Sequence, residues 1–315
     1  MKVITNRLSE EQLNTLKRVA PHVQLVATTT EQETLREIED ADALYGHWIT
    51  PELIRRAKKL RWIQVGHVGV EGLMFPELAN SDIVLCNARG TTGVNIAEHV
   101  MALILAFART LNITIRRQQE KVWEKRVNMP VLEIAGDTLG IIGLGSIGLQ
   151  VAKRARAFDM RILAVDPTQT YKPDDVESLW RLDRLHGMLS QSDFVAICCP
   201  LTPETEGMMG APEFRAMKET AFLINIARGR IVKQDELVQA LQAGEIAGAG
   251  LDATDPEPLP QDSPLWEMQN VIITPHHAGQ SPKAPARVFG LFCENLRRFV
   301  GNQPLLNVVD KSRWY

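Results

Sequence analysis

One segment of the chain restricts the choice of fold more than any other. It reads LGIIGLGSIGLQVAKRA and places Gly143, Gly145 and Gly148 after a predicted strand and at the start of a predicted helix. In such a strand–turn–helix the first glycine permits a tight turn, the second lets the backbone approach a phosphate, and the third lets the helix pack on the strand. The segment therefore predicts the phosphate turn of a dinucleotide-binding α/β domain.

The residues around this turn also bear on which dinucleotide binds. We expect the amides of Gly145, Ser146 and Ile147 to face the phosphates, because the start of a helix carries unpaired N–H groups. Asp166 ends the next predicted strand, where this fold places an acid for the ribose hydroxyls. A carboxylate there repels the 2′-phosphate of NADP, and the nearest following cation in DPTQTYKPD is Lys172. We predict NAD as the cofactor, with NADP as the less favoured alternative.

Two series of short apolar segments, separated by helical patterns, run along the chain of 315 residues, which is long enough for two domains. Such alternation favours parallel sheets with crossover helices. The first series has predicted strands at 2–5, 23–28, 43–46, 61–66 and 83–87, and the second at 138–143, 161–166, 194–199, 221–226, 248–253 and 271–275. The predicted fold class is α/β, with two Rossmann-like, doubly wound parallel sheets and a cleft between them.

The helical patterns add detail near the domain boundaries. Residues 9–20 predict a helix with Ser9 as N-cap and Gln12 completing a capping box. A long apolar-periodic helix is predicted from Asn95 to about Arg117, followed by an irregular stretch to Gly136.

The last helix, predicted over about 283–300, follows the second series of strands and is expected to return to the first domain. We therefore expect residues 1–96 with 283–315 to form one domain, which the family resemblance given below implies to be a substrate-binding, flavodoxin-like domain. Residues 97–282 are expected to form an NAD-binding Rossmann domain.

Composition excludes several classes of function. The net charge is −3 and the basic residues are scattered, so no nucleic-acid partner is predicted. The longest apolar run, VMALILAFA at 100–108, is about half the ~18 residues of a membrane span, and the N-terminus has no signal-peptide core, so no membrane association is predicted. No CxxC or metal-ligand spacing occurs, which favours reduced thiols, a cytoplasmic location and no metal site. The four cysteines are Cys86, Cys198, Cys199 and Cys293.

Three later strand ends each carry ionisable residues. They are Arg228 in INIARG, Asp252, Asp255 and Glu257 in LDATDPEP, and His276 and His277 in TPHHAG. Because ligands of open α/β sheets bind outside the carboxyl ends of the strands, these loops should converge on one crevice. Arginine binds a carboxylate with a planar fork, histidine exchanges a proton with a carbonyl oxygen, and a neighbouring carboxylate orients the ring. This set of residues suits the reduction of a keto acid.

These motifs resemble the NAD-dependent D-isomer-specific 2-hydroxyacid dehydrogenases, a family that includes D-glycerate, D-lactate and 3-phosphoglycerate dehydrogenases. GIIGLGSIG, CCPLTPET, INIARG, LDATDPEP and TPHHAG occur in family order and spacing between about Asn87 and Gly279. The resemblance implies reversible hydride transfer between a 2-keto acid and the D-2-hydroxy acid. It assigns the general acid/base to His276, its partner acid to Glu257 and the substrate anchor to Arg228.

The resemblance implies further contacts. Asp252 would meet the nicotinamide carboxamide, and the amides of Val68 and Gly69 in QVGHVGVEGL would bind the substrate carboxylate. In that loop Glu71 replaces the usual aspartate, and His67 is an additional polar group. The other implied cofactor contacts are Ala227, Arg228, His276 and Gly279 near the nicotinamide, Cys199 and Pro200 near the adenosine, and Thr92.

Several residues have alternative interpretations. Arg228 could be a surface salt-bridge partner, Asp255 competes with Glu257 as the acid, and Asp252 could be a turn former. His277 stands where the family has an apolar or variable residue and receives no role. Formate dehydrogenases of the family carry glutamine in place of Glu257, so formate is not expected as a substrate. The chain ends soon after its last helix, so the regulatory domain of many phosphoglycerate dehydrogenases is not expected either.

The chain as a whole has an alternative function. An NAD-sensing interaction protein, such as the transcriptional corepressors of this fold, retains the same three catalytic residue types. The partners we expect are a small 2-keto or 2-hydroxy acid and, by analogy with the family, a second copy of the chain in a homodimer. The apolar helix 95–117 with Trp123 beyond it could form the dimer interface, although a buried interdomain helix would show the same pattern.

Overall fold

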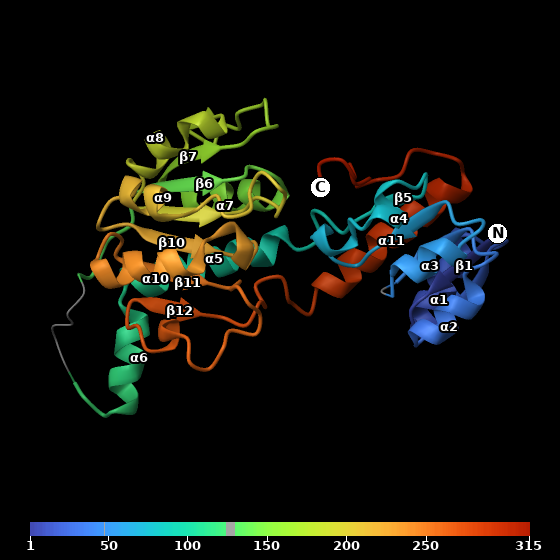
Figure 1. The fold of residues 1–315 in the computed structure, drawn as a ribbon, viewed down its shortest axis with the longest axis horizontal. Helices are drawn as coiled ribbons and strands as arrows, with labels where there is room; N and C mark the ends of the chain where they lie inside the picture. Colours follow the sequence, from blue (N-terminus) through green and yellow to red (C-terminus); the bar gives the residue numbers. More distant parts are fainter. Residues whose placement is uncertain (47, 124–129) are drawn as a thin grey trace. The chain divides into compact units, whose positions relative to one another are not determined.

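The computed structural model describes residues 1–46, 48–123 and 130–315. The chain forms two compact units, one of Met1–Thr91 with Ser281–Tyr315 and the other of Thr92–Gln280 (Figure 1). Residues 124–129 of the predicted irregular stretch lie outside the described residues.

The first unit is built on a five-stranded parallel sheet, in the order β2-β1-β3-β4-β5. This is the strand order of flavodoxin-like domains. Each strand lies within a segment predicted from the sequence, usually one or two residues shorter. The strands are β1 Lys2–Thr5, β2 Gln24–Ala27, β3 Ala43–Tyr45, β4 Trp62–Gln64 and β5 Val84–Cys86.

Among the residues described in this unit, five α-helices accompany the sheet. Helix α1 begins as predicted, because the Ser9 hydroxyl accepts a hydrogen bond from the Gln12 amide at 3.2 Å and the Ser9 amide donates to Gln12 Oε1 at 2.9 Å. This capping box provides partners for groups that a helix leaves unpaired at its start. The helices are α1 Glu10–Val19, α2 Glu31–Glu37, α3 Pro51–Arg56, α4 Pro76–Ala79 and α11 Ala284–Val300.

Helix α11 belongs to the first unit although it comes last in the sequence. Its Phe292 is fully buried and stacks on Tyr45, with ring centroids 4.0 Å apart. Its Asn295 is also buried and donates to Gln64 Oε1 at 2.8 Å and to the Leu306 carbonyl at 3.0 Å. A buried amide with both donors satisfied fixes the helix to the end of β4.

The second unit is built on a seven-stranded parallel sheet, in the order β12-β11-β10-β9-β6-β7-β8. Chain order reverses direction between β6 and β9, which is the switch point where dinucleotide-binding sheets hold their ligand. Predicted segments contain all of these strands except β8, whose side chains are only partly buried. The strands are β6 Thr138–Ile142, β7 Arg161–Val165, β8 Ser178–Trp180, β9 Phe194–Ile197, β10 Phe222–Asn225, β11 Gly248–Leu251 and β12 Val271–Ile273.

Helices cover both faces of this sheet. They are α5 Gly93–Ala108, α6 Leu111–Gln119, α7 Ser146–Arg156, α8 Leu185–Leu189, α9 Ala211–Ala216 and α10 Gln234–Ala243. Strand β9 shows the arrangement, because successive side chains of a strand point to opposite faces. Phe194 and Ala196 pack in one apolar cluster with α5 and α7, whereas Val195 and Ile197 pack in another with α8, α9 and α10.

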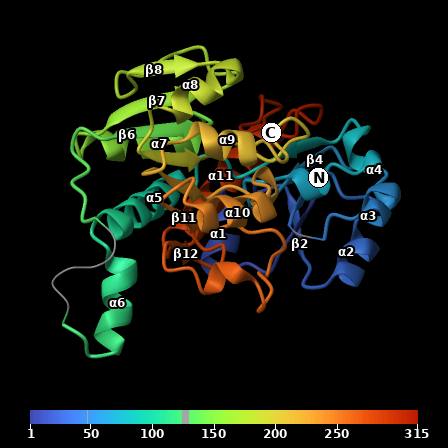
Figure 2. The same cartoon turned by 60° about the vertical axis from the view of Figure 1, so that its left-hand side comes forward.

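The predicted long helix over 95–117 is wrong in one respect, because it is two helices that meet at 69°. The break falls at Thr110, which has a left-handed backbone conformation with φ 54°. Residues 92–96, expected in the first domain, belong to the second unit because α5 begins at Gly93 and packs closely on α7. Figures 1 and 2 both show α6 projecting away from the sheet of its unit.

Within the part of the chain that the structure describes, no single helix has the length and apolar character needed to cross a bilayer. Among the described helices, one pair, α5 with α6, reaches that length and composition when the two are taken together across their bend.

Candidate active site

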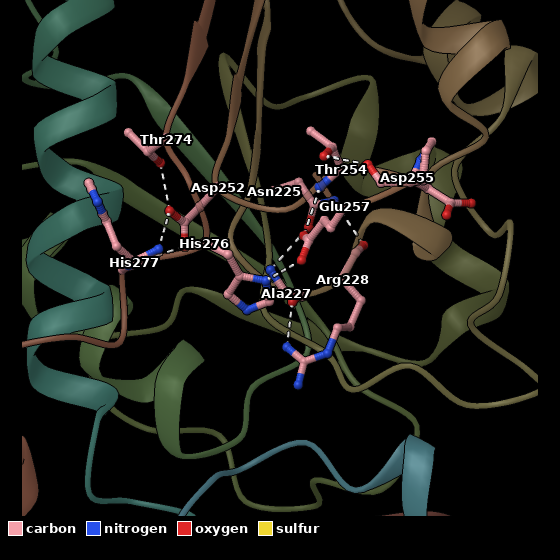
Figure 3. Close-up of polar contacts among 12 residues, drawn as sticks. Asn225, Ala227, Arg228, Asp252, Thr254, Asp255, Glu257, Thr274, His276 and His277 are labelled. Carbon is pink, nitrogen blue, oxygen red and sulfur yellow. Dashed lines mark hydrogen bonds and ion pairs between the residues drawn. The ribbon is translucent and has the colours of Figure 1, made fainter. Parts of the chain in front are cut away.

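The ionisable strand ends of the second unit lie side by side, because β10, β11 and β12 are neighbours in the parallel sheet. Arg228 follows β10, Asp252 and Glu257 follow β11, and His276 follows β12. Figure 3 shows these side chains gathered at the carboxyl ends of the strands. The convergence predicted from the sequence is therefore present.

His276 and Glu257 form a direct pair. The Nδ1 atom of His276 lies 2.8 Å from Glu257 Oε2, and the other carboxylate oxygen accepts the Thr254 amide at 3.1 Å. The pair is open to solvent, with side chains 42% and 39% exposed. With Nδ1–H donating to the carboxylate, Nε2 is the ring nitrogen left for a substrate. The competing acid, Asp255, donates its backbone amide to Gln234 Oε1 at 3.0 Å.

The carboxylate of Asp252 holds the loop that carries His276. This carboxylate is 2% exposed, and it accepts hydrogen bonds from the Thr274 hydroxyl at 2.6 Å, the His277 amide at 3.0 Å and the Ala278 amide at 2.9 Å. His276 has a left-handed backbone with φ 50°, a conformation that costs a residue other than glycine about 1–2 kcal/mol. Asp252 therefore fixes the loop that carries His276 (residues 274–279, the histidine loop) in a strained conformation. It does more than form a turn, which was the alternative that the sequence allowed.

Helix α5 supplies two further contacts to this loop. Asn95 donates to the Ala278 carbonyl at 3.1 Å, and His99 Nε2 lies 3.0 Å from the Thr274 hydroxyl. The two residues are one helical turn apart and thus lie on the same face of α5. Sequence reasoning missed both as site residues, and their i, i+4 spacing is the only signal that the sequence offers.

Arg228 lies in the loop next to Glu257. Its Nη1 donates to the Ala227 carbonyl at 2.7 Å, and Asn225 holds the loop by donating to the Arg228 carbonyl at 2.9 Å and accepting the Ala227 amide at 3.0 Å. At Gly229 a Cβ atom would lie 1.9 Å from the Thr254 carbonyl oxygen, so only glycine fits there. This close approach brings the Arg228 loop against the loop that carries Glu257.

The glycine turn after β6 has the three features that phosphate binding requires. Gly143 has φ 94°, which favours glycine, and a Cβ at Gly148 would lie 2.2 Å from the Gly143 oxygen. A Cβ at Gly145 would meet nothing within 4 Å. The turn is thus tight at its first and third glycines and open at its second, beside the first-turn amides of Ser146 and Ile147 in α7. These residues fit a dinucleotide phosphate.

Asp166 lies at the end of β7 beside this turn. One carboxylate oxygen accepts the Leu144 amide at 2.7 Å, and the other accepts the amides of Thr168 and Gln169 at 2.8 and 2.7 Å. The guanidinium of Arg181, the first residue after β8, donates to the carbonyls of Asp166 and Pro167. Sequence reasoning missed this cation because it considered only the residues directly after Asp166.

Other predicted cofactor contacts also surround the turn. A Cβ at Gly143 would lie 2.6 Å from the Cys199 amide, so Cys199 and Pro200 adjoin the turn. Gly93 packs closely on Ser146, which places Thr92 nearby. Burial raises the pKa of the Cys199 thiol to about 12, so it remains protonated and contributes packing here.

The predicted substrate amides belong to the first unit. The carbonyl of His67 accepts the Ala88 amide at 2.9 Å, and the carbonyl of Val68 accepts Asn87 Nδ2 at 2.8 Å. In a planar trans peptide the next N–H points opposite to the carbonyl, so the amides of Val68 and Gly69 point away from these partners. His67 is exposed, and its Nδ1 contacts the Gly69 carbonyl at 2.6 Å.

Comparisons with known proteins agree with this geometry. Residues 101–278 match the family model for the D-isomer specific 2-hydroxyacid dehydrogenase NAD binding domain. The chain is 34% identical over 310 residues to the glyoxylate reductase of Korarchaeum cryptofilum, a match that covers 94% of this chain and 92% of that protein.

Two further comparisons extend over almost the whole chain. It is 33% identical over 314 residues to the D-3-phosphoglycerate dehydrogenase of Methanocaldococcus jannaschii. This match covers 98% of this chain and 59% of that protein, so the chain spans about three fifths of this relative's length. The crystal structure of a D-isomer specific 2-hydroxyacid dehydrogenase from Xanthobacter autotrophicus, in complex with NADPH and MES, is 28% identical. It has a TM-score of 0.87 and covers 100% of this chain and 99% of that one.

Proposed function

The chain belongs to the D-isomer specific 2-hydroxyacid dehydrogenase family, and on that premise we propose that it interconverts a 2-keto acid and the D-2-hydroxy acid with NAD(H). One observation carries the proposal. The sheet places an oriented His276–Glu257 pair, 2.8 Å apart, in loops that adjoin the Arg228 loop. These are a proton donor, its carboxylate and a carboxylate-binding arginine, as keto acid reduction requires.

Each of the three residues has a distinct part in the proposed reaction. The Arg228 guanidinium binds the substrate carboxylate and so presents the adjacent carbonyl group to His276. When bound, the nicotinamide cofactor supplies the hydride that adds to the carbonyl carbon. His276 donates the proton of Nε2 to the carbonyl oxygen, and Glu257 stabilises the protonated ring through Nδ1. In the oxidation of the hydroxy acid, Nε2 takes that proton back.

Binding of the cofactor is assigned to the glycine turn and the residues around it. The amides at Gly145, Ser146 and Ile147 bind the phosphates, and Asp166 binds the ribose. At the nicotinamide, Asp252 binds the carboxamide. The other proposed contacts are Gly143, Gly148, Thr92, Cys199, Pro200, Ala227, Arg228, His276 and Gly279.

We further propose NAD over NADP. The carboxylate of Asp166 supports this choice, because it would repel a 2′-phosphate. Arg181 is the opposing feature, since it is a cation next to Asp166, and the Xanthobacter autotrophicus relative is in complex with NADPH. Kinetics with both cofactors decide between them.

For the substrate carboxylate we also assign the amides of Val68 and Gly69, whose orientation away from the neighbouring strand end supports this role. We propose a homodimer, supported by the large apolar side chains that Leu111, Ile115 and Trp123 expose on or just after α6. A cytoplasmic location is supported by the four cysteines, all of which carry free thiols.

The test is NADH oxidation with glyoxylate, hydroxypyruvate, pyruvate, 2-ketoisocaproate and phenylpyruvate, repeated with NADPH. We expect turnover with at least one acid, a D-configured product, and loss of turnover in His276→Ala with NADH binding retained. Binding of NADH without turnover of any acid would contradict the proposal and favour an NAD-sensing interaction protein.

A further inference from the structure

Three potential metal ligands from separate segments converge beside the histidine loop. His99 comes from α5, Asp252 follows β11 and His277 follows β12. One ligand atom from each lies within 4.8 Å of the others, and His99 Nε2 is 3.8 Å from Asp252 Oδ1. The two imidazole rings meet edge to face with centroids 5.3 Å apart, and Figure 3 shows His277 and Asp252 beside α5.

The proposed reaction leaves the two imidazoles of this group unexplained. The proton donor is His276, and Glu257 orients it on the other side of the loop. The side chain of His277 is exposed and has no part in that step. His99 is half-buried, and it contacts the loop through the Thr274 hydroxyl at 3.0 Å and through the ring of His277. Two imidazoles thus lie against the buried carboxylate of Asp252 without a part in the proposed reaction.

We propose that His99, Asp252 and His277 form a binding site for a divalent transition-metal ion of the zinc type. Two imidazole nitrogens and one carboxylate oxygen are ligands that Zn²⁺ and Co²⁺ accept, with solvent in the remaining position. Mg²⁺ and Ca²⁺ prefer sites made of oxygen ligands, so neither should compete.

The distances fit such a site after a small adjustment. Two ligand atoms on one tetrahedral zinc ion are about 3.4 Å apart. The 3.8 Å between His99 Nε2 and Asp252 Oδ1 must therefore close by about 0.4 Å, and the other separations, all within 4.8 Å, by at most about 1.4 Å. His277 is exposed on a loop and can make most of this movement, whereas Asp252 is fixed by three hydrogen bonds. The Thr274 hydroxyl now links His99 to Asp252 at 3.0 and 2.6 Å, and the metal ion takes the place of this link.

On the proposed function, a metal ion bound at this site should inhibit turnover. Asp252 is assigned to the nicotinamide carboxamide, and it also holds the loop of His276. A metal ion on Asp252 would compete with the carboxamide and shift the loop. The bound ion is therefore a reversible inhibitor, which a chelator removes.

Binding is tested first, without any enzyme assay. Tag-free protein is titrated with Co²⁺, and the visible absorption of the bound ion is recorded. We expect saturable binding in the wild type, affinity at least about tenfold weaker in His277→Ala and His99→Ala, and full competition by Zn²⁺ but none by Mg²⁺. The exposed His22, in the first unit, provides the matched control, and His22→Ala should bind as the wild type does.

Equal Co²⁺ affinity in the wild type and His277→Ala would overturn the site, as would equal competition by Mg²⁺. Turnover is measured next. His277→Ala should keep the basal rate and lose inhibition by micromolar Zn²⁺, while His22→Ala keeps both. If Co²⁺ binds as expected but Zn²⁺ leaves turnover unchanged, the metal site stands and the assignment of Asp252 to the nicotinamide fails.

Discussion

Replacing Glu257 by glutamine tests the proposed catalytic pair most directly. In the wild type the carboxylate lies 2.8 Å from His276 Nδ1, where, in the proposed reaction, it stabilises the protonated ring that donates the proton. Glutamine has nearly the same size and can still accept the Nδ1–H hydrogen bond. The substitution therefore removes the charge and little else.

The expected fall in kcat for Glu257→Gln can be estimated from the distance and the exposure of the pair. Two unit charges 2.8 Å apart attract by about 1.5 kcal/mol in water and by about 6 kcal/mol at an effective dielectric constant of about 20. Both side chains are roughly two fifths exposed, so solvent screening places the loss near the lower value, at about 1.5–3 kcal/mol. Since about 1.4 kcal/mol corresponds to a factor of ten, kcat should fall by about 10- to 150-fold.

The double variant gives the sharper result. His276→Ala removes the proposed proton donor and should lower kcat by about 10²- to 10⁴-fold. Because Glu257 acts through His276, adding Glu257→Gln to His276→Ala should cost little more. Initial rates of NADH oxidation with the best keto acid give kcat, and fluorescence titration with NADH shows that binding is retained in each variant.

Asp255 provides the matched control, because it is a carboxylate two residues from Glu257 in the same loop. Asp255→Asn should keep the wild-type rate. The reasoning is refuted if Glu257→Gln lowers kcat by the same factor with and without His276. It is equally refuted if Asp255→Asn is as damaging as Glu257→Gln.

Three other predictions concern the cofactor turn and the projecting helix. Gly145→Val should abolish NADH binding and leave the thermal midpoint of unfolding unchanged, since the valine side chain enters the open space of the turn. Gly148→Ala should instead lower the free energy of unfolding in urea by about 1–3 kcal/mol, because its Cβ meets the Gly143 oxygen. Asp166→Ser should raise the ratio of kcat/KM for NADPH over NADH at least about tenfold; an unchanged ratio would show that the carboxylate does not select the cofactor. Ile115→Glu should convert a dimer into a monomer by light scattering, and a dimer that persists would place the interface elsewhere.

Much of the second unit's sheet could be predicted because its strands are buried on both faces. Such strands appear as short, continuous apolar segments, and those that contain β9 and β10 are of this kind. Strand β8 was missed because its side chains are only partly buried, so no apolar segment marks it. The bend at Thr110 was missed because hydrophobic periodicity continues on both sides of it, and the change of direction lies in one backbone angle.

In the candidate site, too, some features could be predicted from the sequence and others could not. Arg228, Glu257 and His276 could be identified because each follows a strand, and neighbouring parallel strands end at one edge of the sheet. The contact between His99 and Thr274 could not, because it joins residues 175 positions apart and follows from how α5 packs on the sheet. The position of Arg181 next to Asp166 depends in the same way on β8 pairing with β7.

Asp252 shows why a residue can be identified from the sequence while its contacts cannot. A charged residue at a strand end indicates the edge where ligands bind, but it does not show whether the side chain faces a ligand or a neighbouring loop. The structure directs three hydrogen bonds of the histidine loop to this buried carboxylate. Hydrogen bonds to a charged group contribute about 1.5–3 kcal/mol each, which exceeds the roughly 1–2 kcal/mol cost of the left-handed backbone at His276. The carboxylate can therefore hold the His276 ring in place before any ligand binds, and an asparagine at this position would lose that charge.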